Sequence, residues 1–191
     1  FGKALAYALG VPLVAINHIE AHLYAPHLES EIRYPHLGVI VSGGHTIIAE
    51  VNAWHQMDVI GTTIDDACGE AFDKVAKILN VLPSQGAMIG GRVVAELAEQ
   101  GRSDAIRFPR AMIKEDSLDF SFSGLKSAGV RYVGRSQITP LEAGAEMDPA
   151  QVSSDLLDLL ASYQKSVVDQ VLDRLRVELD EIISEHSGKS E

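Results

Sequence analysis

Two histidines four residues apart are the first candidates for chemistry in this sequence. His18 and His22 frame the segment His18-Ile19-Glu20-Ala21-His22. In a helix both imidazoles project from one face, with a spacing suited to one metal ion. Glu20 lies about 200° around such a helix, which excludes the metalloprotease arrangement with a glutamate beside the metal. On their own, the two histidines are only a moderate signal for a metal site, because such pairs also occur by chance.

A firm metal site needs a third ligand, commonly a carboxylate. The sequence offers several candidates, and no spacing singles one of them out. They are His27, Asp65, Asp66 and Asp73.

A glycine turn between two predicted strands is the second candidate site. In the segment Val41-Ser42-Gly43-Gly44-His45-Thr46, adjacent glycines let the backbone approach a ligand and present amide N–H groups to a phosphate or acyl-phosphate. The alternative is a plain hairpin turn that needs glycine for a positive φ. Ser42 and His45 make a poor nucleophile and base, because residues three apart in a bend need not face one another.

Polar residues also gather at the starts of two predicted helices. Asp65 and Asp66 open the first, as the helix dipole favours, and Asp73 one or two turns later could bind hydroxyl groups of a ligand. The second start, Phe120-Ser121-Phe122-Ser123-Gly124-Leu125-Lys126, places hydroxyls, a glycine and a lysine ahead of a helix, a layout suited to an anionic ligand. Any serine-rich helix start looks like this, so the segment is a weak signal alone.

The elements that must position these residues alternate between helices and short strands. Gly10 is expected to end the first helix and Asn17 to cap the second. The hydrophobic periodicity predicts helices over 3–9, 18–28, 65–79, 92–99 and 155–184. Strands are predicted over 13–16, 37–41, 46–51 and 57–60, loops over 82–91 and 139–148, and irregular structure over 103–123.

The composition is that of an ordinary soluble protein with room for one domain or two small ones. The chain has 191 residues, 46% of them apolar, and no stretch approaches the ~20 apolar residues of a membrane helix. It begins at Phe1 without a methionine or a secretion signal, so we expect a chain entered partway. Cys68 is the single cysteine, which favours a reducing compartment and a small buried residue rather than a reactive one.

The net charge of −11 argues against a nucleic-acid partner, but the charge is unevenly distributed. Residues 1–69 hold 2 basic and 7 acidic side chains, 70–137 hold 10 and 8, and 138–191 hold 4 and 12. The mildly cationic middle forms either a phosphate-facing surface or a solvated mixed surface. Its candidate cations are Arg92, Arg102, Arg107, Arg110, Lys114, Lys126, Arg131 and Arg135.

Four segments together resemble one family over nearly the whole chain. They are the histidine segment 18–22, the glycine turn 41–46, the segment Asp65-Asp66-Ala67-Cys68-Gly69-Glu70-Ala71-Phe72-Asp73-Lys74, and the segment 120–126. In this order and spacing they resemble the TsaD family, the tRNA adenosine threonylcarbamoyltransferases formerly described as glycoprotease-like proteins. The amino-acid sequence of the third segment resembles the bacterial or organellar branch of this family.

The resemblance implies an α/β fold with two lobes, like that of actin, hexokinase and the heat-shock chaperone ATPases, of which this chain holds the central portion. Residues 1–80 would belong to the first lobe and 81–191 to the second lobe with a helical insertion. The implied reaction transfers the threonylcarbamoyl group from threonylcarbamoyl-adenylate to the exocyclic amine of the adenosine beside the anticodon. Its substrates are tRNAs that read codons beginning with A.

The resemblance also implies site residues and partners, with no catalytic residue assigned. His18 and His22 match the ligands of one divalent metal, Fe²⁺ as first choice and zinc as second. The adenylate would be bound by residues that match Ile40, Val41, Ser42, Gly43, Gly44, Asp73 and Gly91. The implied partners are tRNA, threonylcarbamoyl-adenylate and TsaB-like and TsaE-like subunits, with no membrane, in the cytoplasm or in a eukaryotic organelle.

Three departures limit what the resemblance carries over. The family has a strand-rich segment ahead of Phe1, and after Glu191 it has a nucleotide-contacting segment and the aspartate that is the third metal ligand. The family's Pro-Gly-Gly appears here as Ile89-Gly90-Gly91, after extra residues 83–88, with Gly86 as a competing match. We therefore expect this chain alone to bind metal weakly and to transfer nothing.

Two other functions were weighed. A non-catalytic TsaD-like assembly subunit is the alternative, and the intact pair His18 and His22 argues against it. A protease lacks a credible nucleophile and base in this sequence.

Overall fold

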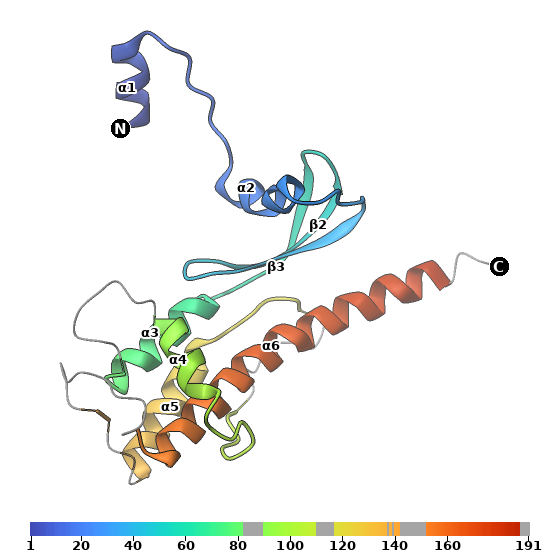
Figure 1. Ribbon diagram of the computed structural model, residues 1–191. Helices are drawn as coiled ribbons and strands as arrows, with labels where there is room; N and C mark the ends of the chain where they lie inside the picture. Colours follow the sequence, from blue (N-terminus) through green and yellow to red (C-terminus); the bar gives the residue numbers. More distant parts are fainter. Residues whose placement is uncertain (82–89, 110–116, 137, 139, 142–151, 188–191) are drawn as a thin grey trace.

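The computed structural model describes residues 1–81, 90–109, 117–136, 138, 140–141 and 152–187 (Figure 1). Within them it is an α/β chain with a small antiparallel sheet and six α-helices, as the α/β prediction requires. The elements are α1 (Gly2–Leu9), α2 (His18–Tyr24), the 3₁₀ turn η1 (Ala25–Leu28), β1 (His36–Val41), β2 (Thr46–Ala53), β3 (Gln56–Thr62), α3 (Cys68–Ile78), α4 (Gly90–Ala98), α5 (Ser123–Arg135) and α6 (Ser154–Ser187).

The sheet has the order β1-β2-β3, and its central strand is buried on both faces. Side chains alternate along a strand, so Ile47, Ala49 and Val51 pack on the side of α2 while Ile48 packs into the helical core. Strand β1 can lie close to α2 because Gly38 has no side chain. A Cβ there would lie 2.3 Å from Cδ2 of Leu23.

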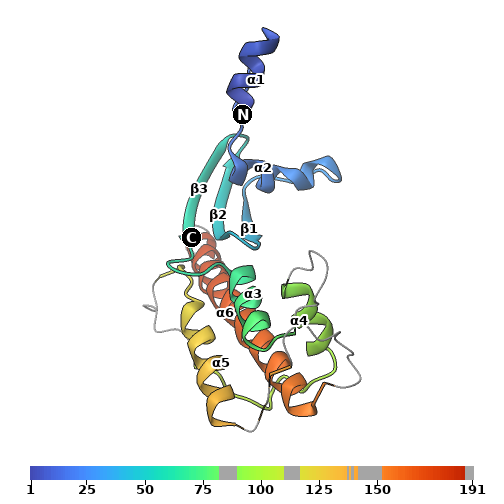
Figure 2. The same ribbon diagram turned by 90° about the vertical axis from the view of Figure 1, so that its left-hand side faces the viewer.

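The helical half of the molecule is built around the first half of α6 (Figure 2). Helices α3, α4 and α5 contact one another or α6, and α6 extends beyond them (Figure 1). Tyr163 of α6 is fully buried, and its hydroxyl donates a hydrogen bond of 3.2 Å to the backbone carbonyl of Ala71 in α3. This buried bond fixes α6 against the helix that starts beside the glycine turn.

The segment between sheet and helices is pinned by backbone pairing. Thr63 and Phe120 form an isolated parallel bridge, in which Phe120 N–H donates to Thr62 O at 2.9 Å and Ile64 N–H donates to Phe120 O at 2.9 Å. The side chain of Asp119 also accepts a hydrogen bond from Thr62 N–H at 3.0 Å. The start of α3 and the start of α5 are therefore held side by side.

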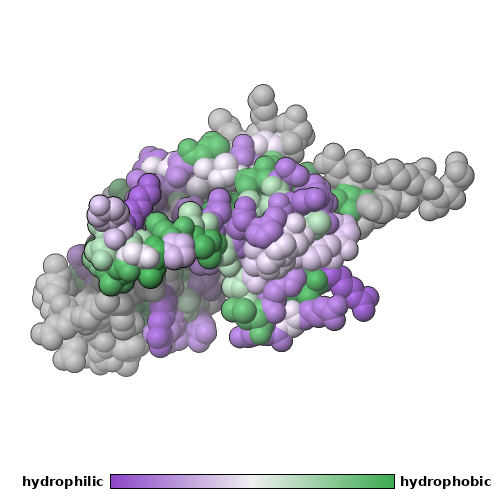
Figure 3. Space-filling view, turned by 90° about the horizontal axis from the view of Figure 1, so that it is seen from above, coloured by the Kyte–Doolittle hydropathy of each residue, from purple (hydrophilic) through white to green (hydrophobic). Residues whose placement is uncertain are grey.

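The N-terminal segment departs from its prediction. Helix α1 ends where expected, with Gly10 in the left-handed conformation at φ 65°, but the predicted strand 13–16 is wrong. Leu13, Val14 and Ile16 are 53%, 79% and 75% exposed, because the described residues provide no neighbouring strand to pair with them. Figure 3 looks down on this end of the molecule and shows apolar side chains gathered on its surface.

Most other predicted elements are confirmed, with changed ends. The predicted helix 65–79 begins only at Cys68, and Gly90 and Gly91 begin α4 instead of ending a loop. Residues 82–89, 139 and 142–148 of the two predicted loops lie outside the described residues. None of the helices in the described part of the chain is long and apolar enough to cross a membrane.

Candidate functional site

The two histidines are presented as a pair by the first turns of α2. Asn17 caps this helix, because its Oδ1 accepts hydrogen bonds from the N–H groups of Ile19 at 2.8 Å and Glu20 at 3.2 Å. The Nε2 atoms of His18 and His22 lie 3.2 Å apart, and both residues are exposed. The predicted pairing of the two imidazoles on one face is confirmed.

The donor set fits a transition metal. The two Nε2 atoms lie 3.2 Å apart, so for an ion about 2.1 Å from each of them the N–metal–N angle would be roughly 100°. This angle is close to the tetrahedral geometry of zinc. Neutral imidazole nitrogen also suits iron. Within the described residues no group of three or more His, Cys, Asp or Glu side chains is placed to hold a metal. The pair can therefore supply two ligands, and the role of His18 and His22 as ligands stays a prediction.

Three of the four candidates for a third ligand are occupied elsewhere in the described structure. His27 contacts Tyr34, with its Nε2 3.1 Å from the phenol oxygen and the two rings stacked. Asp65 binds the start of α5, and Asp66 binds Lys74.

The glycine turn lies next to the histidine pair. The rings of His18 and His45 have centroids 5.6 Å apart. Ser42 closes the turn by accepting a hydrogen bond from the His45 N–H at 3.0 Å and donating one to the His45 carbonyl at 3.2 Å. The Ser42 hydroxyl thus contacts the backbone of His45 and not its imidazole, in agreement with our rejection of a nucleophile and base.

Neither glycine of the turn is required by the turn itself. Gly43 and Gly44 both lack the positive φ that the plain hairpin alternative needed. A Cβ at either position would meet nothing within 4 Å among the described residues, and both residues are exposed. Their N–H groups have no hydrogen-bond partner in the described part of the chain. Two exposed backbone N–H groups without a partner in the described structure can donate hydrogen bonds to an anionic ligand.

The start of α3 is hydrogen-bonded to the glycine turn and to the first residue of β2. The N–H of Gly69 donates to the Ser42 carbonyl at 3.0 Å, and the N–H of Cys68 donates to the buried hydroxyl of Thr46 at 2.8 Å. At Gly69 a Cβ would lie 2.7 Å from Cα of Gly43, so glycine is required here by close approach. The turn is thus fixed by backbone contacts to a helix N-terminus, a favourable place for negative charge.

Asp73 lies one turn further along α3 and faces the start of α4. Its Oδ1 is buried and has no hydrogen-bond partner in the described part of the chain. A Cβ at Gly90 would lie 2.7 Å from this oxygen, whereas one at Gly91 would make only an ordinary contact with Phe72. The structure therefore brings Asp73 to the Gly90-Gly91 segment, and a buried, unpaired carboxylate oxygen is a free acceptor for a donor group. The ligand roles of Asp73 and Gly91 stay predictions.

Asp65 has a different role from the one predicted. It was expected to open α3, but its carboxylate caps α5, accepting hydrogen bonds from the N–H groups of Phe122 at 2.8 Å and Ser123 at 3.2 Å. The hydroxyls of Ser121 and Ser123 also donate to it, at 2.5 and 2.8 Å. Burial raises the pKa of Asp65, but these hydrogen bonds outweigh burial and hold the pKa below its ordinary value.

This cap also corrects the interpretation of the segment 120–126. The sequence predicts that its hydroxyls suit an anionic ligand, and the anion that Ser121 and Ser123 bind is the chain's own carboxylate, Asp65. Sequence reasoning missed this contact because the partners lie more than fifty residues apart, and Ser-rich helix starts give no clue to their partner.

Lys74 and Cys68 complete the surroundings of α3. The Lys74 ammonium bonds to Asp66 at 2.5 Å and Glu70 at 2.8 Å, and these hydrogen bonds raise its pKa. Cys68 is 5% exposed, and burial raises the pKa of its thiol to about 11. The expectation of a small buried cysteine is confirmed.

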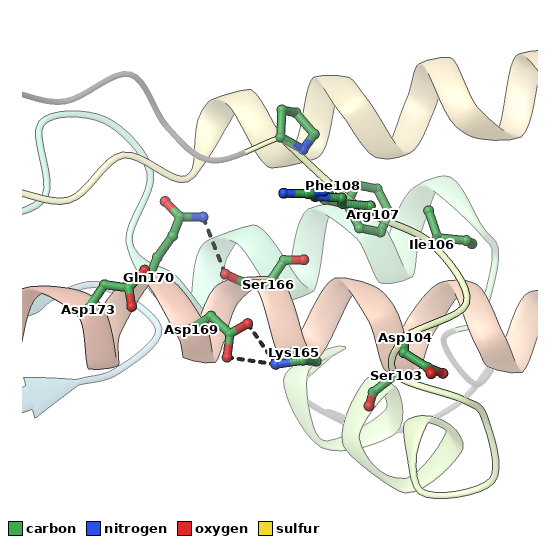
Figure 4. Close-up of a pocket in the computed structure, with 11 residues that line it drawn as sticks. Ser103, Asp104, Ile106, Arg107, Phe108, Lys165, Ser166, Asp169, Gln170 and Asp173 are labelled. Carbon is green, nitrogen blue, oxygen red and sulfur yellow. Dashed lines mark hydrogen bonds and ion pairs between the residues drawn. The ribbon is translucent and has the colours of Figure 1, made fainter.

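A separate pocket lies away from this site. It has a volume of about 540 Å³ and lies between the segment 103–109 and α6, with the Lys165–Asp169 ion pair at its wall (Figure 4). None of the predicted site residues lines it. We place the candidate site at the histidine pair and the glycine turn because the unpaired donors and acceptors lie there.

Comparison with known proteins identifies the family of the chain. Residues 1–184 match the family model of TsaD, tRNA N6-adenosine threonylcarbamoyltransferase. A protein of that name from Geotalea daltonii is 43% identical over 174 residues, which are 91% of this chain and 46% of the relative. The protein of the same name from Clostridioides difficile is 42% identical over 170 residues, 88% of this chain and 46% of the relative.

A third relative of that name, from Clostridium botulinum, is 40% identical over 174 residues. The chain spans about half the length of these curated relatives. The family match covers the histidine pair, the glycine turn, Asp73 and Gly91 alike. On the strength of this match across nearly its whole length, the chain belongs to the TsaD family.

Proposed function

We propose that this chain is the part of a tRNA N6-adenosine threonylcarbamoyltransferase that carries two metal ligands and the adenylate-binding turn. The observation that carries the proposal is the state of Gly43 and Gly44, whose conformation and surroundings do not require glycine and whose N–H groups are unpaired in the described structure. A ligand that approaches the backbone gives both features one explanation. The names of the relatives supply the reaction class.

The donor, threonylcarbamoyl-adenylate, carries a phosphate that suits the turn. The residues Ile40 to Gly44 would cradle it, with the N–H groups of Gly43 and Gly44 donating to its oxygens. Asp73 would accept hydrogen bonds from ligand hydroxyls at its buried oxygen Oδ1, beside Gly91 at the start of α4. These groups would bind and orient the donor, and because the rings of His18 and His45 lie 5.6 Å apart, the reacting carbonyl would lie near the histidine pair.

His18 and His22 would hold one divalent metal, Fe²⁺ or zinc, together with a ligand from outside the described residues. When bound, the metal would polarise the carbonyl of the donor and stabilise the negative charge that develops on it. The contribution of α2 is to fix the two imidazoles in advance, through the Asn17 cap and the packing of Leu23 on β1.

The wider arrangement is part of the same proposal. In a two-lobed ATPase-like fold, residues 1–80 would belong to the first lobe and 81–191 to the second lobe with a helical insertion. The partners would be tRNA and TsaB-like and TsaE-like subunits, in the cytoplasm.

Metal binding tests the histidine assignment directly. We expect the 191-residue chain to bind Zn²⁺, and Fe²⁺ without oxygen, weakly and with one ion per chain. H18A/H22A should lose this binding, whereas H36A/H55A, which removes two histidines outside the pair, should keep it. Equal binding by all three proteins would refute the assignment, with circular dichroism showing that each is folded.

A further inference from the structure

The structure sorts the cations of the central segment into paired and unpaired groups. Arg92 bonds to Glu96 at 2.8 Å, and Arg102 bonds to Asp158 at 2.7 Å. Arg110 and Lys114 lie outside the described residues. Those that keep no ion pair within the described residues are Arg107, Lys126, Arg131 and Arg135.

Two of the unpaired cations share one face of α5. Arg131 and Arg135 are four residues apart, so they are neighbours on the helix surface, and both are exposed. The 13 residues of α5 contain no Asp or Glu. Like charges at this spacing destabilise a helix by a few tenths of a kcal/mol. A cation pair with no acidic partner among the described residues, in a chain of net charge −11, points to an anion that binds there.

The surface between them is hollowed, and none of the described residues that line this hollow is acidic, whereas Asp155 and Asp158 line a second hollow on the other side of Tyr132 and Ser136. A hollow of about 510 Å³ is lined by Pro109, Ala128, Arg131, Tyr132, Arg135 and Ser136. Tyr132 is 37% exposed and stands between the two arginines in sequence. Guanidinium groups bind phosphate oxygens in a bidentate manner, and an exposed tyrosine ring can stack on a sugar or base. This combination suits a nucleic-acid backbone better than a single small anion.

We propose that Arg131, Tyr132 and Arg135 form a contact surface for the sugar–phosphate backbone of tRNA. This surface rests on the proposed function, which makes tRNA the substrate. The N-terminal end of α5 is tied to Asp65 beside the start of α3, and Arg131 and Arg135 lie about 12 and about 18 Å further along this helix. A tRNA molecule is large enough to occupy this surface while its anticodon loop reaches the glycine turn.

Salt-dependent tRNA binding by the 191-residue chain tests the surface. The probe is an unmodified tRNA that reads codons beginning with A, titrated at several salt concentrations. R131E/R135E should lower the affinity at least tenfold and reduce the slope of log K against log salt by about 1.5 to 2, the value for two lost phosphate contacts. R131Q/R135Q should show the same change in slope, and Y132A should lower the affinity severalfold with the slope unchanged.

The matched control is K77E/R176E, which changes the net charge by the same amount at two exposed positions on other helices. It should bind tRNA nearly as wild type does. Three results would overturn the proposal: no tRNA binding by the wild-type chain, an unchanged slope in R131E/R135E, or an equal loss in the control. Binding of an acidic polypeptide in place of tRNA would assign the surface to a protein partner and overturn it too.

Failure of the tRNA-surface proposal can be distinguished from failure of the proposed function, because the two proposals are tested by different variants. If only the surface assignment fails, R131E/R135E binds tRNA normally while H18A/H22A still loses metal. If the proposed function fails, H18A/H22A retains its metal binding whatever the arginine variants do.

Discussion

The carboxylate of Asp65 accepts two hydrogen bonds from Ser123, one from its hydroxyl at 2.8 Å and one from its backbone N–H at 3.2 Å. Helix α5 begins at Ser123, and its own N-cap residue, Phe122, provides no side-chain cap. The cap therefore comes from a residue 58 positions earlier in the chain. Through this contact the start of α5 is fixed to the segment that leads from the sheet into α3.

Removal of this cap should destabilise the fold. We expect D65A to lower the free energy of unfolding by about 1 kcal/mol, the usual cost of losing a helix cap. Urea denaturation followed by circular dichroism measures the change. Asp58 is exposed on β3 and its side chain makes no hydrogen bond or ion pair in the described structure, so D58A should stay within about 0.5 kcal/mol of wild type. Equal effects of the two substitutions would contradict the capping role.

The same carboxylate predicts a pH dependence. Burial raises the pKa of Asp65, but the hydrogen bonds from Ser121, Phe122 and Ser123 lower the pKa by a larger amount. The folded-state pKa of Asp65 therefore lies below its unfolded value. Its contribution is then fully present above about pH 4, the ordinary range of aspartate, and is lost as the pH falls through the folded-state pKa. The stability difference between wild type and D65A should therefore shrink below about pH 4. A difference that is constant from pH 7 to pH 3 would show that the ionised carboxylate is not the cause.

Close contact between the glycine turn and α3 predicts a sharp difference between two glycines. A Cβ at Gly69 would lie 2.7 Å from Cα of Gly43 and 2.8 Å from the Ser42 carbonyl oxygen, and backbone atoms cannot move aside cheaply. G69A should cost about 1 to 3 kcal/mol. Gly124 lies in α5 with nothing within 4 Å of its Cβ position, so G124A should be neutral or stabilising by up to about 1 kcal/mol. Thermal denaturation of both variants checks this, and a stable G69A would mean that the turn does not pack on α3 as described.

Cys68 should be unreactive in the folded chain. Burial raises the pKa of its thiol to about 11, so little thiolate is present at neutral pH. With an aromatic disulfide reagent at pH 7, we expect the folded protein to react at least about 100-fold more slowly than the protein in urea. Equal rates in the two conditions would show that the start of α3 is open.

Local sequence signals predicted the parts of the fold that depend on neighbours along the chain. The Asn17 cap, the end of α1 at Gly10 and the hairpin around Gly43 were all recognised, because their causes lie within a few residues. The strand predicted over 13–16 failed because a strand needs a partner, and apolar character alone does not supply one.

The candidate site was predicted less completely. The spacing of His18 and His22 was enough to pair them, since a helix fixes that geometry. The nearness of His45 to His18 and the contact between Asp73 and Gly90 could not be read from spacing, because each joins residues from different elements. For the same reason, Asp65 was assigned to the nearer helix.

The most direct test of the account is threonylcarbamoyl transfer by a full-length chimera. In the relative from Geotalea daltonii, residues 1–184 of this chain would replace the matching segment, and the modified nucleoside formed on unmodified tRNA from threonylcarbamoyl-adenylate would be measured by mass spectrometry. We predict that the chimera is active, that its H36A/H55A version stays active, and that its H18A/H22A version loses activity by a factor on the order of 100 or more. The 191-residue chain alone should form no product. A folded H18A/H22A chimera with undiminished transfer, or a folded, metal-binding chimera with none, would contradict the account.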